Sequence, residues 1–332
     1  MNRIKKDDPC AGTLSRRNMI GGLAAAGLAA TKLSASPAEA LAEGGPCRMF
    51  SSLSPGSIGM KTGPKESIAL AAEFGFGGVE PNAAFLADLS LEARNELRAE
   101  MKSKGLRFGT GGLPVDFRGD EARFRSQLEA LPRLAQALQA AEVGRVGTWI
   151  MPGHRELTYL ENFRQHAARL REVARILKDS GLRLGLEYVG TPTVRQPQRY
   201  PFLHTMRELR ELIGEIGTGN VGFLLDSWHW WTAGETEADI AALQPAEVVS
   251  VDLNDAPAGI PLEQQQDGKR ELPCATGVIP VAAFLGALLR IGYDGPVRAE
   301  PFNKALNDME DREACAAAAA ALKKALALAG CR

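Results

Sequence analysis

The sequence has no excess of positive charge and no long apolar run. Its 332 residues include 39 Lys or Arg against 40 Asp or Glu, which gives a formal net charge of −1. We therefore expect no basic surface for nucleic acid. No stretch of about eighteen residues is both apolar and free of charge, so we predict no membrane span. Hydrophobic residues make up 45% of the chain, which is ordinary for a globular protein with a sizeable core.

Cysteine and histidine are too few and too scattered to mark a zinc cluster. The chain has five Cys and four His, and no C-x-x-C pair occurs. Cys47 and Cys331 lie near the two ends of the predicted domain. A disulfide between them is one possibility, and two free thiols are the other, because cysteine geometry cannot be read from sequence.

The first forty residues resemble an export signal. A charged start is followed by Ser15-Arg16-Arg17, a Gly/Ala-rich apolar stretch over 21–30 and small residues at Ala38 and Ala40. This order is typical of a twin-arginine signal peptide, whereas a disordered basic tail is the alternative. Cleavage would remove six basic and three acidic residues and leave a net charge of −4. We therefore predict a periplasmic protein and assign residues 41–332 to the folded domain.

Beyond residue 40 a short apolar run, a turn and an amphipathic stretch alternate eight times. The predicted strands cover 48–53, 78–81, 107–111, 145–151, 183–189, 221–226, 248–252 and 296–301. The predicted helices cover 65–74, 91–104, 121–141, 159–180, 204–216, 236–243, 281–291 and 311–328. Strands that alternate with helices pair in parallel, and eight such units can close a barrel. No G-x-G-x-x-G follows the first strand, which disfavours a doubly wound open sheet. We predict a single-domain (β/α)8 TIM barrel.

Carboxylates stand at the carboxyl ends of four successive predicted strands. They are Glu187, Asp226, Asp252 and Glu300. Neighbouring strands lie about 4.8 Å apart, so the four groups would repel one another unless a cation neutralised them. A single carboxylate of this kind could instead cap the following helix, but four in register favour one divalent ion. Their all-oxygen donor set suits Mg²⁺ or Mn²⁺.

These strand ends resemble the xylose isomerase-like barrel family, which includes ketose 3-epimerases and inosose dehydratases. The resemblance spans about 47–328 and rests on four segments: Gly185-Leu186-Glu187, Leu225-Asp226-Ser227-Trp228-His229, Val251-Asp252-Leu253-Asn254-Asp255-Ala256-Pro257, and residues 291–297 running into Glu300-Pro301-Phe302. It implies that Glu187, Asp226 and Glu300 bind a metal and that His229 contacts substrate.

The chain departs from the family pattern at the seventh strand. Asp252 stands where the ketose epimerases carry a histidine ligand, which leaves the metal preference and the reaction open. The substrate-binding arginine of the family follows this strand closely, and here the nearest is Arg270, in a longer loop. By resemblance, Arg270 would anchor a distal oxygen of the substrate.

Further residues at the predicted mouth could bind a sugar. Glu80, at the end of the second strand, is a candidate acceptor for a substrate hydroxyl, and a plain loop carboxylate or a metal ligand is the alternative. Trp149 and Trp228 end or follow strands, and their aromatic faces could pack on sugar C–H groups, although helix packing is the alternative. Arg298 lies two residues before Glu300 on the same predicted strand, so both side chains should point to the same side. Arg298 would then point into the barrel one layer lower and pair with a carboxylate. The alternative is an arginine that extends into solvent at the lower rim.

The resemblance implies a divalent-metal-dependent isomerase or epimerase that acts on a small sugar or cyclitol. Glu187 and Glu300 would be its catalytic base and acid, and a metal-stabilised enediolate its intermediate. One alternative is a lyase or dehydratase acting on an oxo-sugar, 3-oxo-glycoside or inosose, since that intermediate is shared. Another is a non-catalytic sugar-binding protein. Endonucleases of this barrel use a histidine-rich zinc cluster, which four histidines do not match.

Overall fold

The computed structural model describes residues 47–331, so the predicted signal segment, 1–40, lies outside the described residues. A parallel sheet of nine hydrogen-bonded segments forms the centre, in the order β3-β2-β1-β11-β10-β9-β7-β5-β4. These segments are β1 (Phe50–Leu53), β2 (Gly78–Val79), β3 (Arg107–Phe108), β4 (Thr110–Gly112), β5 (Arg145–Ile150), β7 (Arg183–Tyr188), β9 (Val221–Asp226), β10 (Val248–Leu253) and β11 (Pro296–Ala299).

The two ends of this strand order come together at one residue. β3 pairs with β2 and β4 pairs with β5, and Gly109 alone separates β3 from β4. A Cβ atom at Gly109 would lie 2.3 Å from Ser52 Oγ, so only glycine permits this close approach. β3 and β4 are therefore two halves of the third barrel strand, and the predicted TIM barrel is confirmed in its architecture.

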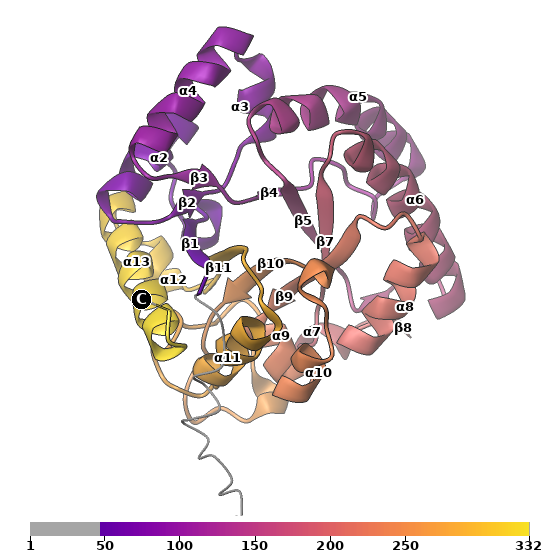
Figure 1. Cartoon of the computed structure of the whole chain (residues 1–332). Coiled ribbons are helices and arrows are strands. Elements are labelled where there is room, and N and C mark those ends of the chain that lie inside the picture. Colours follow the sequence, from indigo (N-terminus) through magenta and orange to yellow (C-terminus); the bar gives the residue numbers. More distant parts are fainter. Residues whose placement is uncertain (1–46, 332) are drawn as a thin grey trace, which may run out of the picture. The chain divides into compact units, whose positions relative to one another are not determined.

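Helices surround the strands in Figure 1. The longer ones are α2 (Pro64–Glu73), α4 (Leu91–Ser103), α5 (Glu121–Ala140), α6 (Tyr159–Asp179), α8 (Met206–Ile216), α11 (Val281–Ile291) and α13 (Asp311–Leu328). Short ones are α3 (Ala83–Asp88), α7 (Pro192–Arg195), α9 (Ser227–Thr232), α10 (Glu237–Ala241) and α12 (Lys304–Asn307), with 3-10 turns η2 (Gly56–Ile58), η3 (Pro245–Glu247) and η4 (Leu262–Gln264). A small antiparallel pair, β6 (Gly153–His154) and β8 (Tyr200–Pro201), lies outside the barrel sheet.

Apolar side chains fill the space between the strands and the helices. Leu184, Leu186, Leu225 and Val251 are almost fully buried on consecutive central strands. α8 shows how a helix joins this core, since Leu209, Leu212 and Ile216 recur at its buried face while its other positions are polar. None of the helices within 47–331 is long and apolar enough to cross a membrane.

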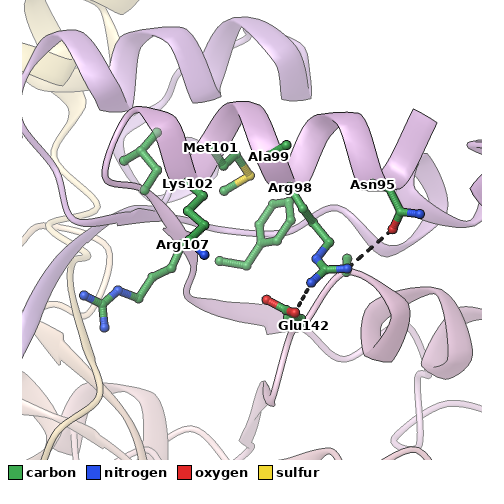
Figure 2. Close-up of a pocket in the computed structure, with 10 residues that line it drawn as sticks. Asn95, Arg98, Ala99, Met101, Lys102, Arg107 and Glu142 are labelled. Atoms are coloured by element: carbon green, nitrogen blue, oxygen red, sulfur yellow. Dashed lines mark hydrogen bonds and ion pairs between the residues drawn. The ribbon is translucent and has the colours of Figure 1, made fainter. Parts of the chain in front are cut away.

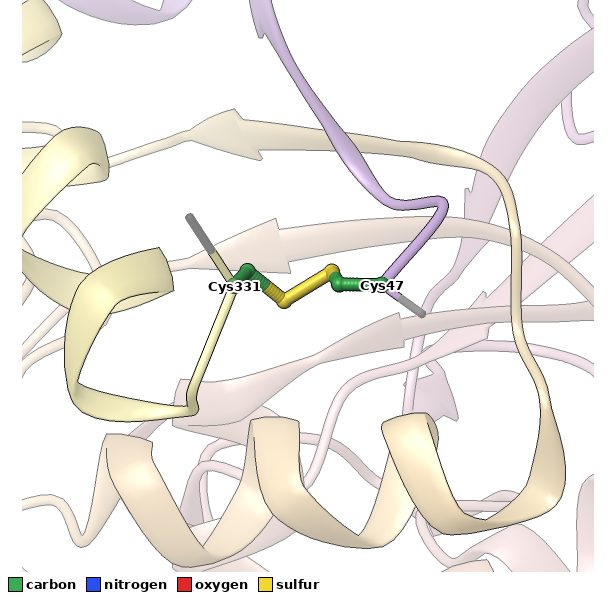
Figure 3. Close-up of a disulfide and its surroundings, with 2 residues drawn as sticks. All are labelled: Cys47 and Cys331. Atoms are coloured by element: carbon green, nitrogen blue, oxygen red, sulfur yellow. A yellow bond between two sulfur atoms is a disulfide. The ribbon is translucent and has the colours of Figure 1, made fainter. Parts of the chain in front are cut away.

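The two ends of the described chain are joined covalently. Cys47 and Cys331 form a disulfide that closes a sequence separation of 284 residues (Figure 3). It ties the segment before β1 to the segment after α13, at the end of the barrel where the strands begin. Cys274 and Cys315 are free thiols.

Candidate functional site

The four predicted carboxylates converge at the carboxyl ends of β7, β9, β10 and β11. Glu187, Asp226, Asp252 and Glu300 each present an oxygen, and these oxygens all lie within 4.8 Å of one another. Asp226 pairs with Asp252 across β9 and β10, so both side chains project from the same face of the sheet. The first three residues are buried, and Glu300 is half-buried.

Asp226 also caps the helix that follows it. Its Oδ1 accepts the backbone N–H of Trp228 at 2.6 Å and of His229 at 3.3 Å, at the start of α9. Asn254 Nδ2 reaches both oxygens of the same carboxylate, at 3.2 and 3.1 Å. Asp226 therefore both caps α9 and belongs to the carboxylate cluster. Asn254, which we did not single out from the sequence, fixes the carboxylate in place.

Two arginines enter the cluster from different directions. Arg270 Nη1 donates to Asp226 Oδ2 at 2.9 Å and to Glu300 Oε2 at 3.2 Å. Arg298 donates to both oxygens of Asp252, at 2.6 and 2.5 Å. The predicted inward position of Arg298 is confirmed. Four carboxylates thus face two guanidinium groups, which leaves an excess of negative charge when all are ionised.

This excess changes the protonation of two glutamates. Burial raises the pKa of Glu187 well above its usual range, and Glu300, Asp226 and Asp252 raise it further. The pKa of Glu300 is raised in the same direction, first by burial and then by Asp252. Glu187 Oε1 is buried and accepts no hydrogen bond from the described residues. Either protons or a cation must therefore compensate the cluster.

The donor set fits a hard divalent cation. Its members are carboxylate oxygens, which Mg²⁺ and Mn²⁺ prefer, and the unpartnered Oε1 of Glu187 is a vacant acceptor within the cluster. Asp252 accepts from Arg298 at both oxygens, and Asp226 also accepts hydrogen bonds at both oxygens, so neither is as free to bind an ion as Glu187. His229 can join a second group of donors with Glu187 and Asp226.

Arg270 and His229 lie behind the cluster. Arg270 is 1% exposed, it is bound by Asp267 at 2.8 Å, and its guanidinium stacks on Phe302 at 4.6 Å. Its Nη2 lies 3.2 Å from His229 Nε2. Because a guanidinium only donates, Nε2 must accept, and the imidazole proton sits on Nδ1. Burial lowers the pKa of His229 to about 4, so this ring is neutral at neutral pH.

Thr191 completes the hydrogen bonding of this group. Its Oγ1 lies 3.4 Å from His229 Nδ1, accepts from Trp228 Nε1 at 2.7 Å and donates to Asp267 Oδ1 at 3.1 Å. Trp228 is 0% exposed, so it cannot pack on a ligand and instead lies beneath Arg270. The hollow that opens onto the carboxylates is not lined by Trp228, His229 or Arg270, because the long loop folds Arg270 inward. Their predicted contact with substrate stays a prediction.

The path of that loop is held by another residue, Asp255, which we did not single out from the sequence. Asp255 is 0% exposed, and its carboxylate accepts backbone N–H groups from Thr276, Gly277 and Ile279 at 2.7 to 2.9 Å. These bonds hold the far end of the loop beside β10. Asn254 and Asp255 stand directly after the predicted strand. Functional residues of barrels are typical of this position, so it could have indicated both residues from the sequence.

A hollow of about 260 Å³ opens onto the carboxylates. Glu187, Asp252, Arg298 and Glu300 form its floor, and Glu80 and Trp149 stand in its wall. Ser54 Oγ donates to Glu80 Oε2 at 2.5 Å. Trp149 is 42% exposed, and the guanidinium of Arg118 stacks on its ring, 4.2 Å from the ring centre. Glu80 and Trp149 thus occupy the positions expected of sugar-binding residues.

A larger hollow lies elsewhere, near the ends where the strands begin. Its volume is about 520 Å³, and α4 and the turn before β5 line it (Figure 2). Arg98 there forms an ion pair with Glu142. Barrel enzymes react at the carboxyl ends of their strands. We therefore assign the candidate active site to the smaller hollow, where the carboxylates converge.

Comparison with known proteins agrees with this geometry. Residues 68–325 match the model of the family described as xylose isomerase-like TIM barrel. The chain belongs to this family. A xylose isomerase domain protein from Alicyclobacillus acidocaldarius is 34% identical, with a TM-score of 0.75, over 85% of this chain and 99% of that one.

Other known proteins are similar to this chain at lower identity. An inosose isomerase from Halalkalibacterium halodurans is 22% identical over 59% of this chain and 66% of its own length, just under two thirds. A zinc-bound IolI protein is 20% identical, with a TM-score of 0.67, over 84% of this chain and 98% of that one. A D-psicose 3-epimerase from Clostridium cellulolyticum, solved with D-tagatose, is 19% identical, with a TM-score of 0.62, over 81% and 94%.

Proposed function

We propose that this protein is a divalent-metal-dependent isomerase or epimerase of a small sugar or cyclitol. The observation that carries the proposal is the buried Oε1 of Glu187, which accepts no hydrogen bond from the described residues. It belongs to a carboxylate cluster at the bottom of an open hollow. The names of the relatives, an inosose isomerase and a ketose 3-epimerase, support the same class of reaction. The reaction begins with removal of a proton from the carbon next to a carbonyl.

Glu187, Asp226, Asp252 and Glu300 would hold the cation. When bound, a divalent cation polarises a carbonyl or hydroxyl oxygen and makes the adjacent C–H more acidic. We propose Mg²⁺ or Mn²⁺, because the cluster offers four carboxylates, the type of ligand that these ions prefer.

Glu187 and Glu300 would move the proton. β7 and β11 flank β9 and β10 on opposite sides, so the two carboxylates reach the hollow from two directions. Without a cation, burial and the neighbouring carboxylates raise the pKa of both glutamates, which favours each of them as an acceptor of the substrate proton. The ionised group takes a proton from one face of the substrate carbon, and the protonated group returns one on the other face.

The wall of the hollow would orient an uncharged, hydroxyl-rich ligand. Trp149 offers an exposed ring to sugar C–H groups, and Glu80, held by Ser54, accepts from a hydroxyl. Arg298 lines the floor, but Asp252 already neutralises it. A phosphate or carboxylate would therefore meet net negative charge, so we propose a ligand without phosphate.

Incubation of candidate ketoses and inososes in deuterated water with Mn²⁺ tests the proposal. We expect deuterium to enter the carbon next to the carbonyl, with an isomer or epimer as the product. Loss of water or of an alcohol with an unsaturated product would instead identify the lyase alternative. The Glu187→Gln and Glu300→Gln variants should bind the sugar without exchange. No exchange by the wild type on a sugar that it binds would identify a binding protein.

We also propose export by the twin-arginine route, with residues 1–40 as the signal. The disulfide between Cys47 and Cys331 supports this location, because such bonds persist in oxidising compartments and are rare in the reducing cytosol.

A further inference from the structure

A second hollow adjoins the candidate active site. It has a volume of about 250 Å³ and lies between the turn after β1, the start of α2 and the residues after β2. Gly56 and Glu80 stand in the walls of both hollows. The two spaces are therefore neighbours at the same end of the barrel.

No side chain divides the two hollows at Gly56. A Cβ atom placed there would meet no atom within 4 Å. Each hollow alone is smaller than the roughly 300–1,000 Å³ of common small-molecule sites, whereas the two together fall within that range. The first hollow thus suits one sugar ring, and the pair suits a ligand of two rings.

The chemistry of the second hollow suits a neutral polar group. Besides Glu80, its lining includes Thr62, Ser67 and Asn82 together with the apolar faces of Met60 and Pro64. None of the described lining residues is a lysine or an arginine, so nothing there would compensate a phosphate or a carboxylate. A sugar ring binds well where hydrogen-bonding side chains lie beside apolar surfaces.

Two of these residues have hydrogen-bonding capacity to offer a ligand. Asn82 uses Oδ1 to cap α3, by accepting from Phe85 N at 2.9 Å, and its Nδ2 makes no hydrogen bond within residues 47–331. Thr62 Oγ1 is 3.0 Å from Ser67 Oγ, which itself donates to Gly63 O at 3.0 Å. Ser67 must therefore accept from Thr62, which leaves the lone pairs of Thr62 Oγ1 available to a hydroxyl of the ligand.

We infer that the substrate is a glycosidically extended sugar, with the reacting ring in the first hollow and a second sugar ring in the second hollow. This inference rests on the proposed function for its chemistry and on the two adjoining hollows for its size. Glu80 stands at the junction, where its carboxylate can accept from a hydroxyl on either side of the linkage. Since Ser54 holds Oε2, the other oxygen is free for this contact.

Deuterium exchange into D-fructose and into three ketose disaccharides, isomaltulose, turanose and lactulose, tests the inference. Their second ring is attached to the 6-, 3- and 4-position of fructose, so the panel samples the linkage geometry. With Mn²⁺ present, we expect at least one disaccharide to exchange with a kcat/KM at least tenfold above that of fructose. A wild type that prefers fructose to all three disaccharides would overturn the inference.

Two variants place bulk in the joined space. Gly56→Leu fills the junction, and Thr62→Tyr fills the second hollow from a position outside the first. Each should lower the kcat/KM of the preferred disaccharide at least tenfold more than that of fructose. Gly144→Leu is the matched control, because a Cβ there also meets no atom within 4 Å and Gly144 precedes β5 at the opposite end. Equal losses on both sugars in the two variants would contradict the inference.

Binding calorimetry separates this inference from the proposed function. If no sugar exchanges hydrogen, the proposed chemistry fails, and affinity then decides the size of the ligand. Binding of a disaccharide at least tenfold tighter than fructose, lost in Gly56→Leu and kept in Gly144→Leu, would support the two-ring site. Equal affinity for one and two rings would overturn it.

Discussion

Arg298 binds both carboxylate oxygens of Asp252, with Nε 2.6 Å from Oδ1 and Nη2 2.5 Å from Oδ2. The two residues are direct partners in the pairing of β10 and β11, so their side chains leave the same face of the sheet. Both are almost fully buried. Asp252 therefore enters the carboxylate cluster with its own counter-charge, unlike Glu187.

Removal of Arg298 should destabilise the fold because it leaves a buried, uncompensated carboxylate. We expect Arg298→Met to lower the free energy of unfolding by about 3–5 kcal/mol. The double variant Arg298→Met, Asp252→Leu should lose clearly less than the sum of the two single variants, because no unpaired charge remains. Urea denaturation of the four proteins in the presence of a chelator measures this coupling. Additive losses would show that the pair is not an energetic unit.

Most of the barrel could be predicted from sequence because its pattern is local. α11 and α13 have the predicted bounds, and β9 does as well, since hydrophobic periodicity and glycine caps mark them. α9 was missed because it begins directly after β9, with Asp226 as its cap and no polar turn between. The pair of β6 and β8 was missed because two-residue strands carry no periodicity.

The candidate site likewise has a part that the sequence predicted and a part that it did not. The positions of the carboxylates at the predicted strand ends indicated where they meet. The position of Arg298 two residues before Glu300 on the same strand indicated that its side chain points inward. The path of the loop after β10 could not be predicted, because tertiary bonds from Asp255 set it and no local pattern does. That path determines that Arg270 lies behind the carboxylates and that Trp228 is buried.

Glu235 should make stability depend on pH. It accepts from the Tyr188 hydroxyl and from Met206 N, and burial raises its pKa to about 7. Between about pH 4.5 and 7 the folded protein holds a proton on Glu235 that the unfolded chain has released, so this contribution to stability falls as pH rises through the window and is level above it. The loss is at most about 3 kcal/mol.

Glu235→Gln should reduce this slope, because the amide stays neutral, while Glu187 and Glu300 keep their own contribution. Urea denaturation at pH 5 and pH 8 measures the difference between the variant and the wild type. Glu129→Gln, on an exposed face of α5, is the control that should keep the wild-type slope. A Glu235→Gln protein with the wild-type slope would place the titration elsewhere.

The disulfide should contribute substantially to stability. Cys47 and Cys331 close a loop of nearly the whole domain, and restriction of the unfolded chain by such a bond is worth roughly 2–5 kcal/mol. We expect Cys47→Ser with Cys331→Ser to melt at a lower temperature and to bind sugar normally, since the bond lies away from the carboxylates. Cys274→Ser should melt like the wild type. A wild type whose melting is unchanged by reductant would contradict this expectation.

The export signal can be tested apart from the enzyme. A fusion of residues 1–40 to a fluorescent protein should reach the periplasm, and the same fusion with Arg16→Lys and Arg17→Lys should stay in the cytoplasm. Cell fractionation provides the measurement. Equal distribution of the two fusions would rule out the twin-arginine route.

Titration of the chelator-treated protein with Mn²⁺ in a calorimeter tests the central claim most directly. We predict one ion per chain, and affinity at least tenfold weaker in Glu187→Gln, in Asp226→Asn and in Asp252→Asn. Binding that is absent in the wild type, or unchanged in Glu187→Gln and Asp226→Asn, would contradict the account.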